Sequence, residues 1–261
     1  ISVFRSFADW WSVYLEIVDL LGIDRGADSM ATRIAHSYVY SAKPPTDFLR
    51  SLIIGKSVVV FGAGPSLESH IDFVEKSFEW RNSIFIAADG ATKALVEVGL
   101  YPHVIATDLD GDLNYIKLAV EKGSLAIIHA HGDNIPVFTD FIKWISRSGR
   151  AFLVTTQVEP IYPVLNFGGF TDGDRALAIA LAFKPQKVLL AGMDFGNVVG
   201  KYSKPWLKNH LQASERKRAK LEIAYRITSM LSCLVTTPIY TLSNAVPQCV
   251  LTLNPFNHSI H

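Results

Sequence analysis

The chain has 261 residues and a formal net charge of +1 at pH 7, and 49% of its residues are hydrophobic, enough for one α/β domain with an appendage or two small domains. This balance predicts neither a nucleic-acid nor a membrane partner, and the longest apolar run, residues 176–183, is too short to span a bilayer. Two cysteines, Cys233 and Cys249, lie outside any zinc-binding spacing, and without a secretory signal pattern they favour a reducing, cytoplasmic compartment.

Residues 1–50 are predicted to form a small helical region. Apolar side chains recur there at three- and four-residue steps, the period of an amphipathic helix, and Gly22 marks the end of the first helix. Asp24 or Asp28 could cap a second helix, and Thr46, after two prolines, is the expected N-cap of a third.

Residues 51–261 are predicted to form an α/β domain, because short β-branched runs alternate with helical patterns. The apolar runs have the composition of strands buried on both faces, which is typical of a mostly parallel, Rossmann-like sheet flanked by helices. The predicted strands cover residues 57–61, 83–88, 103–106, 125–128, 151–155 and 187–191.

A long helix over residues 206–232 and short antiparallel strands over residues 234–253 complete the predicted domain. Four cations crowd the middle of the helix: Arg216, Lys217, Arg218 and Lys220. A solvated helix face is the interpretation we favour, and the alternative is a lid whose cations reach a phosphate.

Glycine, aspartate, histidine and asparagine collect just after the predicted strands rather than before them. In open α/β sheets, ligands bind outside the carboxyl ends of the strands. Five polar loops are therefore expected to converge on one composite site.

Three aspartates, Asp108, Asp110 and Asp112, alternate with other residues directly after the third strand. Two carboxylates about 4 Å apart repel by roughly 4 kcal/mol at a dielectric near 20, and a divalent cation with a preference for oxygen, such as Mg²⁺, turns this repulsion into coordination. We expect Asp108 and Asp110 to bind the metal, whereas Asp112 could instead cap the next helix.

The run Gly62-Ala63-Gly64-Pro65-Ser66 follows the first strand, but Leu67 stands where a dinucleotide-binding fingerprint needs its third glycine. Glycines that let the backbone approach a ligand, and free N–H groups at a helix start, favour a phosphate or nucleotide loop over a plain tight turn. Asp89 and Gly90 follow the second strand. Asp89 could accept a hydrogen bond from a ribose or a pterin-like amine, or cap a helix.

After the fourth strand, His131 and Asp133 are the expected site residues, and Asn134 either caps a helix or contacts the substrate. The oxygen-rich neighbourhood argues against a zinc site here.

The segment that precedes the helix beginning near residue 176 is dense in glycine and acids. It is predicted to be a second phosphate- or metal-binding turn, with Arg175 neutralising charge, and the alternative is a flexible loop ending in a helix cap. Its acidic and capping candidates are Thr171, Asp172 and Asp174, and Asp194 repeats the pattern after the sixth strand. The chain lacks a P-loop and a nucleophile elbow.

Together, GAGPSL, AADGA, GLYPHVIATDLDGD, HAHGDN, GGFTDGDRA and GMDFG resemble the archaeal 6-hydroxymethyl-7,8-dihydropterin pyrophosphokinase family, itself similar in its core to thiamine pyrophosphokinases. The resemblance runs from about Val58 to Phe195. It implies Mg²⁺-dependent transfer of diphosphate from ATP to a pterin hydroxymethyl group, with release of AMP, in folate- or methanopterin-type cofactor synthesis.

Carried over residue by residue, the resemblance implies that Asp108 and Asp110 bind metal. It also implies further acidic site members, Asp133, Asp172 and Asp174, and contacts of Gly62, Gly64 and Ser66 with a phosphate or substrate. His131 or one of the remaining aspartates would receive the hydroxyl proton. Thiamine as acceptor, a glycosyltransferase-like sugar-nucleotide enzyme and a non-catalytic nucleotide-binding module are the alternatives, and a homodimer is left open.

Overall fold

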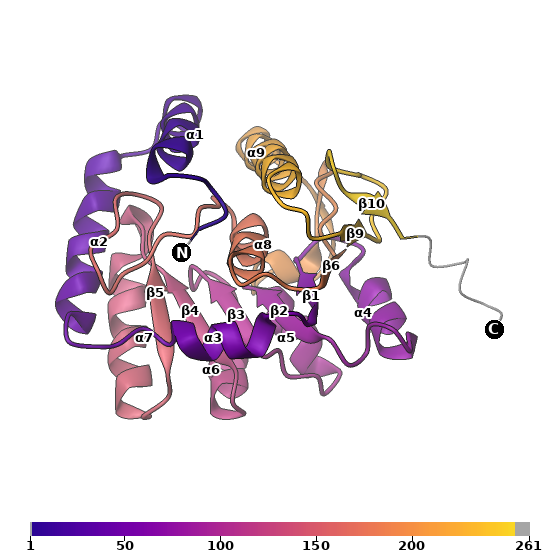
Figure 1. Cartoon of the computed structure of the whole chain (residues 1–261), viewed down its shortest axis with the longest axis horizontal. Coiled ribbons are helices and arrows are strands. Elements are labelled where there is room, and N and C mark those ends of the chain that lie inside the picture. Colours follow the sequence, from indigo (N-terminus) through magenta and orange to yellow (C-terminus); the bar gives the residue numbers. More distant parts are fainter. Residues whose placement is uncertain (1, 254–261) are drawn as a thin grey trace.

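The computed structural model of the chain describes residues 2–253 and contains a sheet of eight parallel strands (Figure 1). In their order across the sheet, these are β10 (Leu251–Thr252), β9 (Ile239–Thr241), β6 (Lys187–Ala191), β1 (Ser57–Phe61), β2 (Ile84–Ala88), β3 (Val104–Thr107), β4 (Leu125–His129) and β5 (Phe152–Thr155). The six strands predicted before residue 192 are confirmed to within one residue at each end. The last part of the predicted 51–261 domain, residues 254–261, lies outside the described residues.

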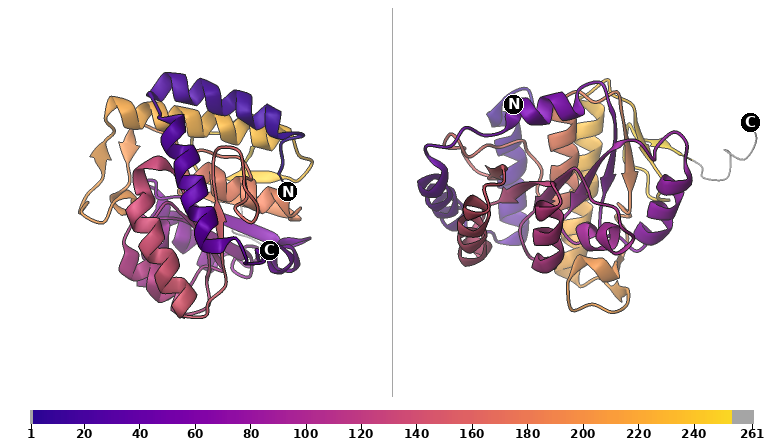
Figure 2. Two further views of the ribbon diagram at one scale, coloured as in Figure 1. Left: turned by 90° about the vertical axis from the view of Figure 1, so that its left-hand side faces the viewer. Right: turned by 90° about the horizontal axis from the view of Figure 1, so that it is seen from below.

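Helices cover both faces of this sheet, which gives a three-layer α/β/α architecture (Figures 1 and 2). One face carries α1 (Phe7–Leu21), α3 (Thr46–Ile53), α8 (Asp172–Ala182) and α9 (Glu215–Cys233). The other face and the β5 edge carry α2 (Arg25–Val39), α4 (Leu67–Lys76), α5 (Ala91–Glu97), α6 (Leu113–Glu121) and α7 (Ile135–Arg147). The strands are therefore buried on both sides, as their continuous apolar runs predict.

The predicted N-terminal helical region is present, and local chemistry fixes its helix ends. Gly22 ends α1 in the left-handed conformation, at φ 64°, which glycine adopts without steric cost. Asp24 caps α2 by accepting hydrogen bonds from two backbone N–H groups. Thr46 is the first helical residue of α3 rather than its N-cap, a position that Pro45 occupies.

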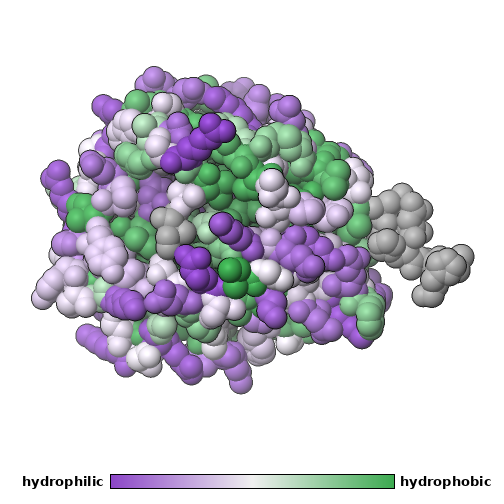
Figure 3. All heavy atoms as spheres, in the orientation of Figure 1, coloured by the Kyte–Doolittle hydropathy of each residue, from purple (hydrophilic) through white to green (hydrophobic). Residues whose placement is uncertain are grey.

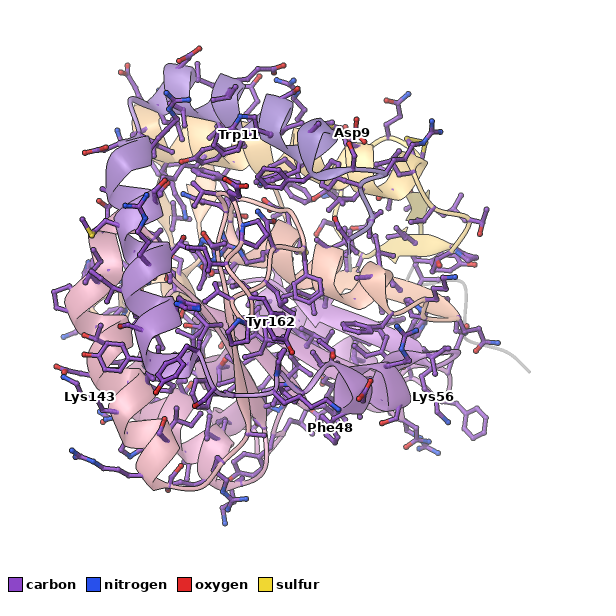
Figure 4. All side chains as sticks on the ribbon, turned by 60° about the vertical axis from the view of Figure 1, so that its left-hand side comes forward. Asp9, Trp11, Phe48, Lys56, Lys143 and Tyr162 are labelled. Atoms are coloured by element: carbon purple, nitrogen blue, oxygen red, sulfur yellow. A yellow bond between two sulfur atoms is a disulfide. The ribbon has the colours of Figure 1, made fainter. Side chains whose placement is uncertain are left out.

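Helix α1 lies over α9 on the outside of the α8 face (Figure 2). Figure 4 shows this face with Trp11 of α1 near its top and Phe48 of α3 near its bottom. Polar side chains dominate the view in Figure 3, and hydrophobic side chains gather between α1 and α9. No helix among the described residues is long and apolar enough to cross a membrane.

The helix predicted over residues 206–232 begins later, since α9 covers Glu215–Cys233 with Ser214 as its N-cap. The preceding residues form β8 (Leu211–Gln212), which pairs with β7 (Val198–Val199) in a small antiparallel ribbon. The 3-10 turn η2 (Lys201–Ser203) lies between these two strands in the chain. This pairing between distant residues overrides the local helical pattern.

The C-terminal strands are parallel to the sheet, not antiparallel as predicted. Helix α9 carries the chain back along the sheet, so β9 enters beside β6 in the same direction. Cys233 at the end of α9 and Cys249 before β10 form a disulfide. This pairing runs against the reducing compartment that the cysteine usage favoured.

Candidate active site

The loops at the carboxyl ends of the strands line one cavity of about 460 Å³. It lies where the strand order reverses: β2 to β5 extend from one side of β1, whereas β6 pairs with its other side. Such a switch point is the usual ligand site of an open α/β sheet. Twelve of the fifteen predicted site residues line the cavity: Gly62, Gly64, Asp89, Gly90, Asp108, Asp110, His131, Asp133, Thr171, Asp172, Arg175 and Asp194.

The other three, Ser66, Asn134 and Asp174, are not among the residues that line the cavity, and they brace the loops that do. The Ser66 hydroxyl donates to an Asp194 carboxylate oxygen at 2.6 Å. The Asn134 side-chain amide donates at 2.7 Å to two carbonyls, that of Asp108 and that of the last β4 residue. Buried Asp174 accepts hydrogen bonds at the N-terminus of α8.

An acidic cluster lies in the cavity: Asp89, Asp108 and Asp172 each offer a carboxylate oxygen, and these oxygens lie within 4.8 Å of one another. Asp110, which the sequence predicts as a ligand beside Asp108, instead contacts the ammonium of Lys204. Asp112 caps α6 by accepting from a backbone N–H at 3.2 Å, which was the alternative for this residue.

Asp89 is fixed by backbone geometry and by its neighbours. Its φ of 39° lies in the left-handed region, and the Thr107 hydroxyl donates to its carboxylate. Gly111 passes so close that a Cβ at this position would overlap the Asp89 carboxylate. These contacts hold the loops after β2 and β3 together. Asp89 does not cap α5, because the N-cap of that helix is Gly90.

Burial and mutual repulsion disfavour the charged forms of two carboxylates in the acidic cluster. Burial and the neighbouring carboxylates raise the pKa values of Asp89 and Asp172 well above the usual range. Burial would also raise the pKa of Asp108, but His131, whose Nε2 lies 3.6 Å from the carboxylate, holds it below that range together with more distant cations. Three carboxylates whose oxygens lie this close together are a donor set for a hard divalent cation such as Mg²⁺.

His129, the last residue of β4, places a buried imidazole beside the cavity. Its side chain is 1% exposed, its Nδ1 lies 3.2 Å from the Thr155 hydroxyl, and its Nε2 has no hydrogen-bond partner among residues 2–253. Burial and the nearby charge of Arg175 lower its pKa well below the usual value. Burial therefore keeps this imidazole neutral beside the cavity.

Two parts of the lining were not assigned to the site from the sequence. The first is the start of α2, where the buried carboxylate of Asp28 reaches the cavity. Asp28 accepts from the Tyr14 hydroxyl at 2.6 Å, the Gln157 amide at 2.7 Å and the Gly132 backbone at 2.8 Å. No local motif marks this residue, since its partners lie far away in the chain.

The second is α9, whose residues Arg216, Lys217 and Lys220 line the cavity with Lys204. The favoured prediction of a solvated face fits the exposed Arg216 and Arg218, whereas Lys217 and Lys220 are partly buried at the cavity. The sequence did carry a signal, because Lys217, Lys220 and the apolar residues 221 and 224 share one helix face.

The glycines after β1 serve close packing between loops. A Cβ at Gly64 would overlap the Gly192 carbonyl and the Asp194 carboxylate, and one at Gly62 would crowd the same loop. The Gly64 N–H donates to the Gly192 carbonyl at 2.8 Å. These glycines therefore join the β1 and β6 loops at the cavity.

Comparison with known proteins identifies the family. Residues 32–200 match a family model described as 6-hydroxymethylpterin diphosphokinase MptE-like. The chain is 37% identical over 228 residues to a 6-hydroxymethyl-7,8-dihydropterin pyrophosphokinase of Methanocaldococcus jannaschii, covering 85% of this chain and 94% of that protein. Proteins of the same name from Pyrococcus furiosus and Methanothermobacter thermautotrophicus are each 38% identical, over 85% of this chain and 93% of theirs.

Among solved structures, the chain is similar to the MAf glycosyltransferase of Magnetospirillum magneticum AMB-1, with a TM-score of 0.56 over 89% of this chain and 39% of that one. At 13% sequence identity this similarity shows a shared fold and nothing about activity. The sequence matches, in contrast, run through β1 to β6 and the loops that line the cavity. The chain therefore belongs to the MptE-like family of 6-hydroxymethylpterin diphosphokinases.

Proposed function

We propose that this protein transfers a diphosphate group from ATP to the hydroxymethyl group of 6-hydroxymethyl-7,8-dihydropterin, with release of AMP. The observation that carries the proposal is the acidic cluster in the cavity of a chain that belongs to this family. A cytoplasmic location, where ATP is available, is part of the same proposal. It requires the Cys233–Cys249 disulfide to persist there, as disulfides do in intracellular proteins of hyperthermophiles.

We assign Mg²⁺ to the acidic cluster, with Asp108 as the central ligand and Asp89 and Asp172 beside it. Bound there, the ion would neutralise phosphate oxygens and hold the transferred group in place. Asp110, predicted as a ligand from the sequence, would have to leave Lys204 to reach the same ion.

Side chains around the cluster supply orientation and charge. The Arg175 guanidinium lies 3.4 Å from an Asp172 oxygen, donates to the Phe170 carbonyl at 2.8 Å, and is buried, so it offers a fixed positive charge to the leaving group. The Nδ1 of His131 accepts the Asp133 backbone N–H at 3.3 Å. The Nε2 of His131 therefore carries a proton that points toward Asp108, so this imidazole has no nitrogen left to accept the hydroxyl proton of the substrate. We therefore favour the exposed Asp133 as the acceptor of that proton.

We place the pterin at the α2 end of the cavity. Asp28 already accepts three hydrogen bonds, and a carboxylate has room for about four. The pterin edge that carries an amino group and a ring N–H donates two hydrogen bonds, and one of them matches the remaining acceptor of Asp28. The aromatic ring would lie at a site that excludes water.

The test is AMP release from ATP and Mg²⁺, with hydroxymethyl-dihydropterin and thiamine compared side by side. We expect AMP only with the pterin. Asp108→Asn should reduce turnover at least about a hundredfold, given that changes even behind a metal ligand cost 10- to 100-fold. Asp112→Asn is the matched control, because asparagine also caps helices well and Asp112 is not among the cavity-lining residues. Equal turnover of thiamine, or full activity of Asp108→Asn, would contradict the proposal.

A further inference from the structure

Two lysines of α9 line the cavity without a fixed counter-charge. Lys217 and Lys220 are both partly buried, and among residues 2–253 no carboxylate oxygen lies within 4.0 Å of either ammonium. Two other cavity cations do have such partners: Lys204 contacts Asp110, and Arg175 lies 3.4 Å from an oxygen of the acidic cluster. The exposed Arg216 instead donates to the Leu21 carbonyl at 3.1 Å.

This arrangement is unfavourable in the absence of a ligand. Burial lowers the pKa of Lys217, and the positive charges of Lys204 and Lys220 lower it further. Like charges gathered in a partly buried site repel strongly because the local dielectric is low. A bound anion would remove this penalty, whereas a merely structural role for the lysines would not require them to face the cavity.

The same cavity also carries the complementary charge. Asp172 of the acidic cluster and Asp110 are the carboxylates whose charges act most on Lys217. Neither forms an ion pair with it within 4.0 Å, so the cavity brings together carboxylates and ammonium groups that do not pair with one another. A polyphosphate chain with a divalent cation fits such a space, since the cation binds the carboxylates and the lysines bind the remaining phosphate oxygens.

We propose that Lys217 and Lys220 bind the polyphosphate chain of ATP in the cavity that also holds the acidic cluster. The proposal rests on the proposed function for its choice of ATP, but its chemistry requires only a metal-bound polyphosphate. It also assigns a role to the cluster of basic residues on α9, which the family motifs do not include. Lysine suits this role because its compact charge can follow phosphates whose positions change during transfer.

The test measures binding of Mg²⁺–tripolyphosphate by calorimetry to the wild-type protein and to Lys217→Ala, Lys220→Ala and the double variant. Each single change should weaken binding about tenfold or more, as expected for one charge-assisted hydrogen bond. The salt dependence of binding should also become shallower in the variants. Arg218→Ala is the matched control, because it removes a cation from the same helix, outside the cavity lining, and should leave the affinity unchanged.

Several outcomes decide the matter. Absence of tripolyphosphate binding by the wild-type protein, or equal affinity in the double alanine variant, overturns the proposal. If the double alanine variant fails to fold, the Lys217→Gln/Lys220→Gln variant keeps the test decisive, because it removes the charges and keeps most of each side chain. Unchanged affinity in this variant would overturn the proposal. The KM for ATP should rise in the alanine variants while the KM for the pterin stays constant. Wild-type protein that binds tripolyphosphate but releases no AMP with any pterin would contradict the proposed function and leave this inference intact.

Discussion

Removing one charge from the acidic cluster should stabilise the metal-free protein. The cluster oxygens lie within 4.8 Å of one another, and two unit charges at that distance repel by about 3.5 kcal/mol at an effective dielectric of 20. Burial and this repulsion raise the pKa of Asp172, and Arg175 offsets part of the effect. A carboxyl group whose native pKa is raised costs stability as the pH rises from its unfolded pKa of about 3.9 through the native value.

Asp172→Asn keeps the shape of the side chain and removes the charge. At pH 7 without metal, we expect the free energy of unfolding to increase by roughly 1 to 3 kcal/mol, which is less than one full repulsive pair because the bond to Arg175 is weakened as well. With Mg²⁺ the order should reverse, since the wild-type protein binds the ion more tightly and gains stability by mass action.

Urea unfolding in EDTA and in excess Mg²⁺ measures both effects. Asp133→Asn is the control, because this exposed aspartate lines the cavity outside the acidic cluster, and it should change neither value by much. A variant less stable than wild type in EDTA would refute the argument from repulsion. Equal stabilisation of both proteins by Mg²⁺ would remove Asp172 from the metal site.

Three further predictions follow from contacts outside the acidic cluster. Replacing Cys233 and Cys249 by serine should lower the free energy of unfolding in urea by about 3 kcal/mol, because the bond closes a loop with a sequence separation of 16; equal stability of the oxidised and serine forms would contradict this. Gly90→Ala should reduce kcat/KM, because its Cβ would overlap the backbone of η2 and displace the segment that carries a cavity cation, whereas Gly196→Ala, with only ordinary contacts, should not. Asp28→Asn should raise the KM for the pterin about tenfold with little change in the KM for ATP, and the opposite pattern would move the pterin away from the α2 end.

The parts of the fold that the sequence predicted well depend on local signals. A buried strand followed by a glycine or an aspartate is visible over about ten residues, and this was sufficient to locate β1 to β6 and the edge of the sheet where the site lies. The cap residues Asp24 and Asp112 were likewise accessible, since each acts within three residues of its own position.

Features that depend on distant partners were not predicted. The pairing of β7 with β8 decides where α9 begins. The direction of β9 depends on the end of the sheet to which α9 returns the chain. Asp28 belongs to the cavity only because Tyr14, Gln157 and Gly132 bring α2 to it. The pairing of Cys233 with Cys249 has the same origin, because spacing alone does not show which elements meet.

The pairing of β1 with β6 at the centre of the sheet has a consequence for how the protein is made. Ser66 and Asp194, which join the loops after these two strands, are 128 residues apart in the chain. Contacts between such distant residues form late, because a long loop must close before they repay its entropy. A chain still emerging from the ribosome therefore cannot complete the cavity until β6 and α9 have both been synthesised. The cavity is thus assembled only when most of the chain has been made.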